Sequence, residues 1–186
     1  MKRIVILISL LSLFSCEDKP VLLPQVDHTV LSKIEDHSPI YMFFKTEGKD
    51  TLIDVNRKNS ISSTNWVFNI DKRLPLRLVI PELIKLQAKK DSIQKQLAFI
   101  PFTKLNFTLE KPKFGVHINF AKNSTVFVNA MEVKKEDLKT YLSHLPSDKP
   151  LHFNYCFDQN SSYGNFVKEL VFAQSNGLQV ESIFVY

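Results

Sequence analysis

Two stretches of the chain, 87 residues apart, repeat one pattern: an apolar strand that ends at an aspartate, followed by a helix. The first strand ends at Asp71 and the second at Asp158. Alternating apolar residues predict strands, and apolar residues spaced three and four apart predict helices. The repeat has two interpretations: a duplicated unit, or two unrelated units that look alike once both are aligned on the aspartate. Under either interpretation the chain mixes helices and strands.

The pattern along the chain predicts an α+β fold. In the first half, strands are expected over residues 40–44, 51–55 and 66–70, with a hairpin turn from Glu47 to Asp50. Pro81 would interrupt the helix that follows, so we expect this helix to begin near Ile80 or to kink there. The second half predicts strands over 105–109, 114–120, 125–129, 151–157 and 179–186, with helices over 134–145 and 163–173.

We therefore predict small sheets with helices packed on one face. The C-terminal unit is expected to have the order β-β-α-β-α-β, and under the duplication interpretation a related unit lies in the N-terminal half. With 186 residues and 44% hydrophobic residues, the chain is long enough to bury a core.

Four residues are interpreted as structural strand-end or cap residues. Asp71 and Asp158 end strands, Ser162 or its neighbour Ser161 precedes a helix, and Gly177 follows that helix. Short polar side chains accept hydrogen bonds from the first amides of a helix, and glycine readily adopts the left-handed conformation after its last turn. The two aspartates also lie where α/β proteins often place functional groups, which remains their alternative role.

The N-terminus has the pattern of a secretory signal over residues 1–15. Lys2 and Arg3 precede an apolar run that reaches Leu11, and the small residue Ser15 lies before Cys16. A helix that spans a membrane needs about 20 apolar residues, more than this run provides. The four residues that end at Cys16 resemble the lipobox of bacterial lipoproteins. The resemblance implies cleavage before Cys16 and attachment of lipid, palmitate among its acyl chains, to this cysteine.

Composition excludes several classes of function. Loss of Lys2 and Arg3 with the signal lowers the formal net charge from +5 to +3, and the remaining basic residues are interspersed with acidic ones, so we expect no nucleic-acid partner. Only 4 glycines occur, too few for a glycine-rich phosphate loop. We expect no enzyme, no cofactor and no metal, since the histidines lack metal-ligand spacing: His28, His37, His117, His144 and His152.

Cys156 is the other cysteine of the chain. If Cys16 is acylated, Cys156 has no partner for an intrachain disulfide. It lies within an alternating apolar run, so we interpret it as a core or half-buried residue and not as a nucleophile.

Residues 103–186 resemble the periplasmic domain of the ExbD/TolR family. The resemblance rests on Thr125 to Asn129, the helix opening from Val133 to Leu138, Asp158, Tyr163 to Val167 and Asn176 to Leu178. Members of this family are periplasm-facing subunits of proton-driven envelope motors, which energise outer-membrane transport or maintain the envelope. The family's domains dimerise, so the resemblance implies a homodimer, and residues 179–186 or 103–109 are the expected pairing edge.

The chain departs from the family in one respect. ExbD and TolR proteins carry a transmembrane helix with an intramembrane aspartate that takes part in proton flow. Here Asp18 and Asp27 lie in a polar segment outside any apolar span. Because a proton relay needs its ionisable group within the membrane, we do not expect this chain to carry protons.

These observations divide the chain into a signal peptide (1–15), a lipidated tether (16–38), an N-terminal α/β unit (39–100) and an ExbD/TolR-like α+β domain (101–186). We expect a lipid-anchored, non-enzymatic protein of the cell envelope that acts by protein–protein interaction, in envelope transport or a biopolymer-transport assembly. The alternative is an envelope lipoprotein that binds a small ligand or glycan through aromatic residues around Trp66. The outer membrane is favoured over the inner one, with the folded part in the periplasm or on the surface.

Overall fold

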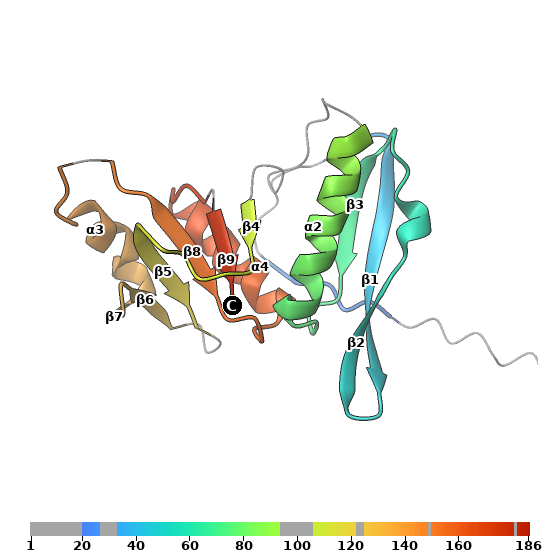
Figure 1. Cartoon of the computed structure of the whole chain (residues 1–186), viewed down its shortest axis with the longest axis horizontal. Coiled ribbons are helices and arrows are strands. Elements are labelled where there is room, and N and C mark those ends of the chain that lie inside the picture. The colour runs from blue at the N-terminus through green and yellow to red at the C-terminus, as the bar shows by residue number, and fades with distance from the viewer. Residues whose placement is uncertain (1–19, 27–32, 94–105, 122–124, 149, 181) are drawn as a thin grey trace, which may run out of the picture.

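The computed structural model describes residues 20–26, 33–93, 106–121, 125–148, 150–180 and 182–186. It has two sheets with helices packed against them (Figure 1), which confirms the predicted α+β class. Cys16, the residues around the predicted domain boundary at 100/101 and the predicted turn at 122–124 lie outside the described residues.

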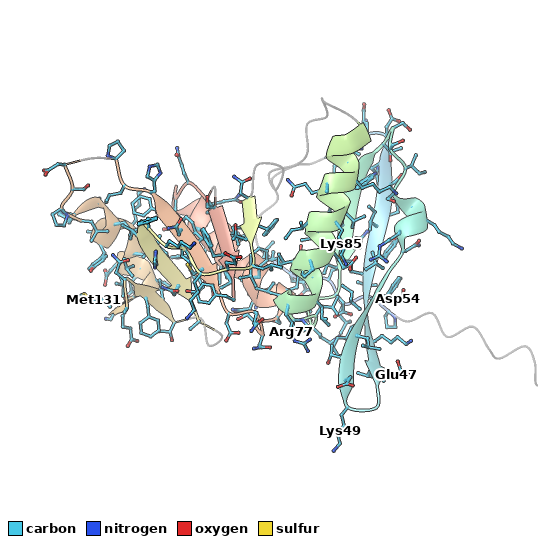
Figure 2. The ribbon with its side chains drawn as sticks, viewed as in Figure 1. Glu47, Lys49, Asp54, Arg77, Lys85 and Met131 are labelled. Carbon is cyan, nitrogen blue, oxygen red and sulfur yellow. The ribbon has the colours of Figure 1, made fainter. Side chains whose placement is uncertain are left out.

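The N-terminal unit is a three-stranded sheet with the order β2-β1-β3. Strand β1 pairs with β2 in antiparallel and with β3 in parallel orientation. The β1–β2 hairpin turns within the predicted residues, with Glu47 paired to Asp50 and Gly48 at φ 61°, and Figure 2 shows Glu47 and Lys49 at its tip. The elements are β1 (His37–Glu47), β2 (Asp50–Val55), the 3-10 helix η2 (Arg57–Asn59), β3 (Asn65–Ile70) and α2 (Leu76–Ile93).

Helix α2 begins at Leu76, so a start near Ile80 is wrong. Pro81 lies inside the helix, where it removes one backbone hydrogen bond. The first turn forms nonetheless because Leu76, Val79 and Ile80 are all 0% exposed, and burial of such side chains contributes about 1.5–3 kcal/mol each.

The C-terminal unit is a six-stranded sheet with the order β4-β9-β8-β5-β6-β7. Its elements are β4 (Asn106–Thr108), β5 (Val116–Phe120), β6 (Val126–Val128), β7 (Met131–Val133), the 3-10 helix η4 (Lys135–Asp137), α3 (Leu138–Ser143), β8 (Phe153–Phe157), α4 (Tyr163–Ser175) and β9 (Ser182–Val185).

Strand β7 is absent from the predicted order β-β-α-β-α-β. It pairs with β6 in antiparallel orientation through a two-residue turn at Asn129 and Ala130, both of which have positive φ. Such turns normally carry glycine at the second position. Because Ala130 stands at this position, the sequence does not predict the turn.

The predicted pairing edge at residues 179–186 is wrong. Strand β9 lies inside the sheet, between β8 and β4, and pairs with both in parallel orientation. Strand β4, within the other predicted segment, is at an edge of this sheet.

Helix α2 contributes to two hydrophobic cores. Val79 and Leu86 pack in the core of the three-stranded sheet, whereas Leu76 and Ile80 pack in the core of the six-stranded sheet. Figure 1 shows α2 between the two sheets. The units are thus joined by apolar contact along this helix.

The parallel strand pair of one unit has the same register as the parallel strand pair of the other. Met42 lies opposite Ile70 in the parallel β1–β3 pair, and Phe120 lies opposite Phe157 in the parallel β5–β8 pair. Ile70 and Phe157 are 87 residues apart, and each precedes the aspartate of its unit. This common plan favours the duplication interpretation of the repeat.

Candidate functional site

The two units meet where β3 and β8 end, in the loops that lead into α2 and α4. We call residues 71–77 and 158–164 the junction. At its centre Pro75 and Ser162 form an isolated antiparallel bridge. These residues precede their helices and are 87 positions apart, so the repeat places them on equivalent positions.

Two hydrogen bonds flank this bridge symmetrically. The amide of Leu76 donates to the carbonyl of Ser161 at 2.9 Å, and the amide of Tyr163 donates to the carbonyl of Leu74 at 2.7 Å. A shift of 87 residues converts the first bond into the second.

Two further hydrogen bonds follow the same rule. The amide of Arg77 donates to the carbonyl of Gln159 at 2.8 Å, and the amide of Gly164 donates to the carbonyl of Lys72 at 3.0 Å. Figure 2 shows Arg77 at the end of α2 that faces the junction. The four bonds together define a pseudo-two-fold axis through the Pro75–Ser162 bridge.

The junction satisfies helix N-termini reciprocally. The first amides of a helix have no partner within the helix and must find one elsewhere. Here the first amides of α2 bond to the loop after β8, and those of α4 bond to the loop after β3. Separating the units would leave these amides without their protein acceptors.

Asp71 is fully buried at the end of β3. Its Oδ1 accepts hydrogen bonds from Arg73 N at 3.0 Å and Arg73 Nε at 2.9 Å, and its Oδ2 accepts one from Arg73 Nη2 at 2.7 Å. Burial raises the pKa of this carboxyl, but the hydrogen bonds from Arg73 and Leu22 outweigh burial, so the pKa lies below its ordinary value of 3.8. Asp71 therefore stays ionised and fixes the loop before α2.

Leu22 is attached to the same place. Its amide donates to Asp71 Oδ2 at 3.2 Å, and its carbonyl accepts from the amide of Lys72 at 2.7 Å. This part of the predicted tether (16–38) is hydrogen-bonded to the folded units, and the end of the predicted tether enters β1, which begins at His37.

Asp158 is half-buried and organises its own loop. Its Oδ1 accepts from the amide of Asn160 at 2.7 Å, and its carbonyl accepts from the amide of Ser161 at 2.9 Å. The equivalent aspartates thus both shape the loop before a helix, Asp71 through a buried ion pair and Asp158 through a turn.

Ser162 and Gly177 lie at the two ends of α4. Ser162 is the N-cap, and its Oγ accepts from the amide of Asn165 at 3.2 Å. Gly177 has φ 72° and follows the last turn, where its amide donates to the carbonyl of Gln174 at 2.9 Å. The structure places Ser162 in the junction with Asp71 and Asp158, and Gly177 at the opposite end of the helix.

Gly164 permits the close approach of the two units. A Cβ at this position would lie 2.9 Å from Lys72 Cβ and 3.2 Å from the carbonyl oxygen of Lys72. Gly164 belongs to the segment that carries the family resemblance but is not among the site residues predicted from the sequence. The available signal was a glycine in the first turn of a helix, where it costs about 1 kcal/mol relative to alanine and therefore indicates a packing requirement.

Two further buried carboxylates occupy equivalent helix positions, Glu82 on α2 and Glu169 on α4. Glu82 pairs with Arg57 of η2 and, at 2.9 Å, with Lys85. Burial raises the pKa of Glu82, but these two cations outweigh it, so the pKa is lowered. Glu169 pairs with Lys135 of η4 at 2.6 Å. Each carboxylate links the middle of its helix to the 3-10 helix of its own unit. The 87-residue shift relates the two positions, so the sequence repeat could have identified this pair.

Other candidate groups are buried. Cys156 is 1% exposed, and burial raises the pKa of its thiol to about 11, so the thiol is protonated near neutral pH. Trp66 is 3% exposed, and its indole Nε1 donates to the carbonyl of Ile61 at 2.6 Å. In the parts of the chain that the structure describes, no three His, Cys, Asp or Glu side chains gather in a way that could hold a metal ion.

A scan against protein-family models gives no match, and searches of curated proteins and of solved structures give none either. Among the helices in the described ranges, none combines the length and apolar character required to cross a bilayer.

Proposed function

We propose that the chain is a lipid-anchored, non-enzymatic protein of the bacterial cell envelope that acts by binding other envelope proteins. Its two units form an intramolecular pair, in place of the homodimer that the ExbD/TolR resemblance implies. The protein acts in transport across the envelope or in assembly of the transport machinery.

The observation that carries this proposal is that the loops after β3 and β8 are occupied by contacts between the two units. In α/β folds, ligands bind beyond the carboxyl ends of parallel strands. The carboxyl ends of β3 and β8 lead directly into the junction, where their loops bond to the helix of the other unit. Asp71, the most deeply buried carboxylate of these loops, is held by Arg73. The aspartate side chains at these strand ends are engaged in shaping the loops whose backbones join the two units.

Helices α3 and α4 contribute to one core with the strands of the mixed six-stranded sheet, and this arrangement supports the proposal. The family's domains pair as separate copies, whereas here the second unit lies on the same chain. The ligand-binding alternative is less favoured because Trp66, on which it depends, is buried and its indole N–H is bonded.

Lipid attachment at Cys16 is tested by mass spectrometry of the N-terminal peptide from the membrane-purified protein. We expect a peptide that begins at Cys16 and carries a diacylglyceryl group and an amide-linked acyl chain. Cys16→Ala should abolish incorporation of labelled palmitate, whereas Cys156→Ala should retain it because that thiol is buried. Palmitate incorporation that survives in Cys16→Ala would contradict the proposal.

A further inference from the structure

Leu22 limits how far the predicted tether can hold the folded units from the membrane. Its two backbone hydrogen bonds, to Asp71 and Lys72, attach the chain to the junction six residues after Cys16. If Cys16 is lipidated, as the proposed function requires, only these six residues separate the membrane from the folded units. Six fully extended residues span about 22 Å at most. The 23 residues of the whole predicted tether would span about 80 Å.

The surface beside this attachment suits a lipid bilayer. Leu22 and Leu23 are consecutive leucines that are 41% and 46% exposed. Lys72 follows Asp71 and is also exposed, and its positive charge complements anionic lipid headgroups. Exposed apolar side chains flanked by cations are typical of surfaces that lie in the interface of a membrane.

We propose that the surface formed by Leu22, Leu23 and Lys72 rests on the membrane that holds the lipid anchor. The two leucines enter the interfacial region, and Lys72 contacts anionic headgroups. The part of the junction to which Leu22 is hydrogen-bonded then lies next to the bilayer.

The test is lipid-phase quenching of a fluorophore on the lipidated protein in vesicles that contain phosphatidylglycerol. In a Cys156→Ala background, single cysteines replace Leu23 or Ile61. Ile61 is a matched control, because it is an aliphatic residue that is 52% exposed and precedes β3, at the end of this strand away from Asp71. We expect brominated lipid chains to quench the label at position 23 more strongly than the label at position 61, by a factor of about two or more.

Mass spectrometry of the same sample separates the two proposals. A lipidated chain whose label at position 23 is quenched no more than the label at position 61 overturns this inference and leaves the proposed function standing. A chain without lipid on Cys16 overturns the proposed function and this inference with it.

Discussion

Replacing Gly164 by valine is expected to lower the free energy of unfolding by about 2–3 kcal/mol, because the new side chain overlaps Lys72 of the other unit. The obstacle includes backbone, the carbonyl oxygen of Lys72, which also accepts the hydrogen bond from the Gly164 amide. The units must move apart to make room. Urea denaturation followed by circular dichroism measures this loss.

Arg77→Val provides the matched control. Arg77 occupies the equivalent position in α2 and is exposed, so its replacement should change stability by only about 0.5 kcal/mol. Similar losses for both variants would show that the penalty comes from valine in a first helical turn and not from the contact between units.

Asp71→Asn is expected to destabilise the protein by about 2 kcal/mol at pH 7. The amide group places donors against Arg73 or the Leu22 amide and removes the charge that pairs with Arg73. Asp158→Asn should cost less than about 1 kcal/mol, since Asp158 is half-buried and an amide oxygen can still accept from Asn160. Equal losses for the two variants would contradict the role assigned to Asp71.

The effect of Asp71→Asn should depend on pH in a defined direction. The pKa of Asp71 is lower in the folded protein than its ordinary value of 3.8. Its ionised carboxylate therefore stabilises the fold above pH 3.8, and this contribution is lost as the pH falls through the lower folded-state pKa. The difference between wild type and variant, measured by urea denaturation, should be full at pH 7 and shrink below pH 3.8. A difference that does not change with pH would exclude this origin.

The sequence predicts the fold class and the elements whose signal is local. The β1–β2 hairpin follows from alternation around Gly48, and the ends of α4 follow from Ser162 and Gly177. In each case a few adjacent residues carry the information, because a cap or a tight turn is made by neighbours in the chain.

Elements that depend on distant residues are not predictable in this way. The start of α2 at Leu76 relies on acceptors in the loop after β8, some 85 residues away, and on the core of the other unit. Of the two alternatives that local rules about Pro81 predict, a start near Ile80 or a kink there, the first is therefore wrong. Strand β7 escapes detection because it has three residues and because Ala130 stands where its turn would normally carry glycine.

Only part of the candidate site can be predicted from the sequence. Asp71, Asp158 and Ser162 can be recognised as loop and cap residues, but their meeting at one junction depends on the pairing of the units. The 87-residue shift already places Pro75 on Ser162. Taken as a symmetry operation, that shift predicts a contact between equivalent loops.

Amide hydrogen exchange at the junction tests most directly whether the two units form one reciprocal pair. First-turn amides without a protein acceptor exchange rapidly, whereas hydrogen-bonded ones are protected. We predict that the amides of Leu76, Arg77, Tyr163 and Gly164 are protected with similar opening free energies, and that Gly164→Val lowers the protection of Leu76 and Arg77 in the other unit. Leu76 and Arg77 amides that exchange as fast as those of an unstructured chain would contradict the account.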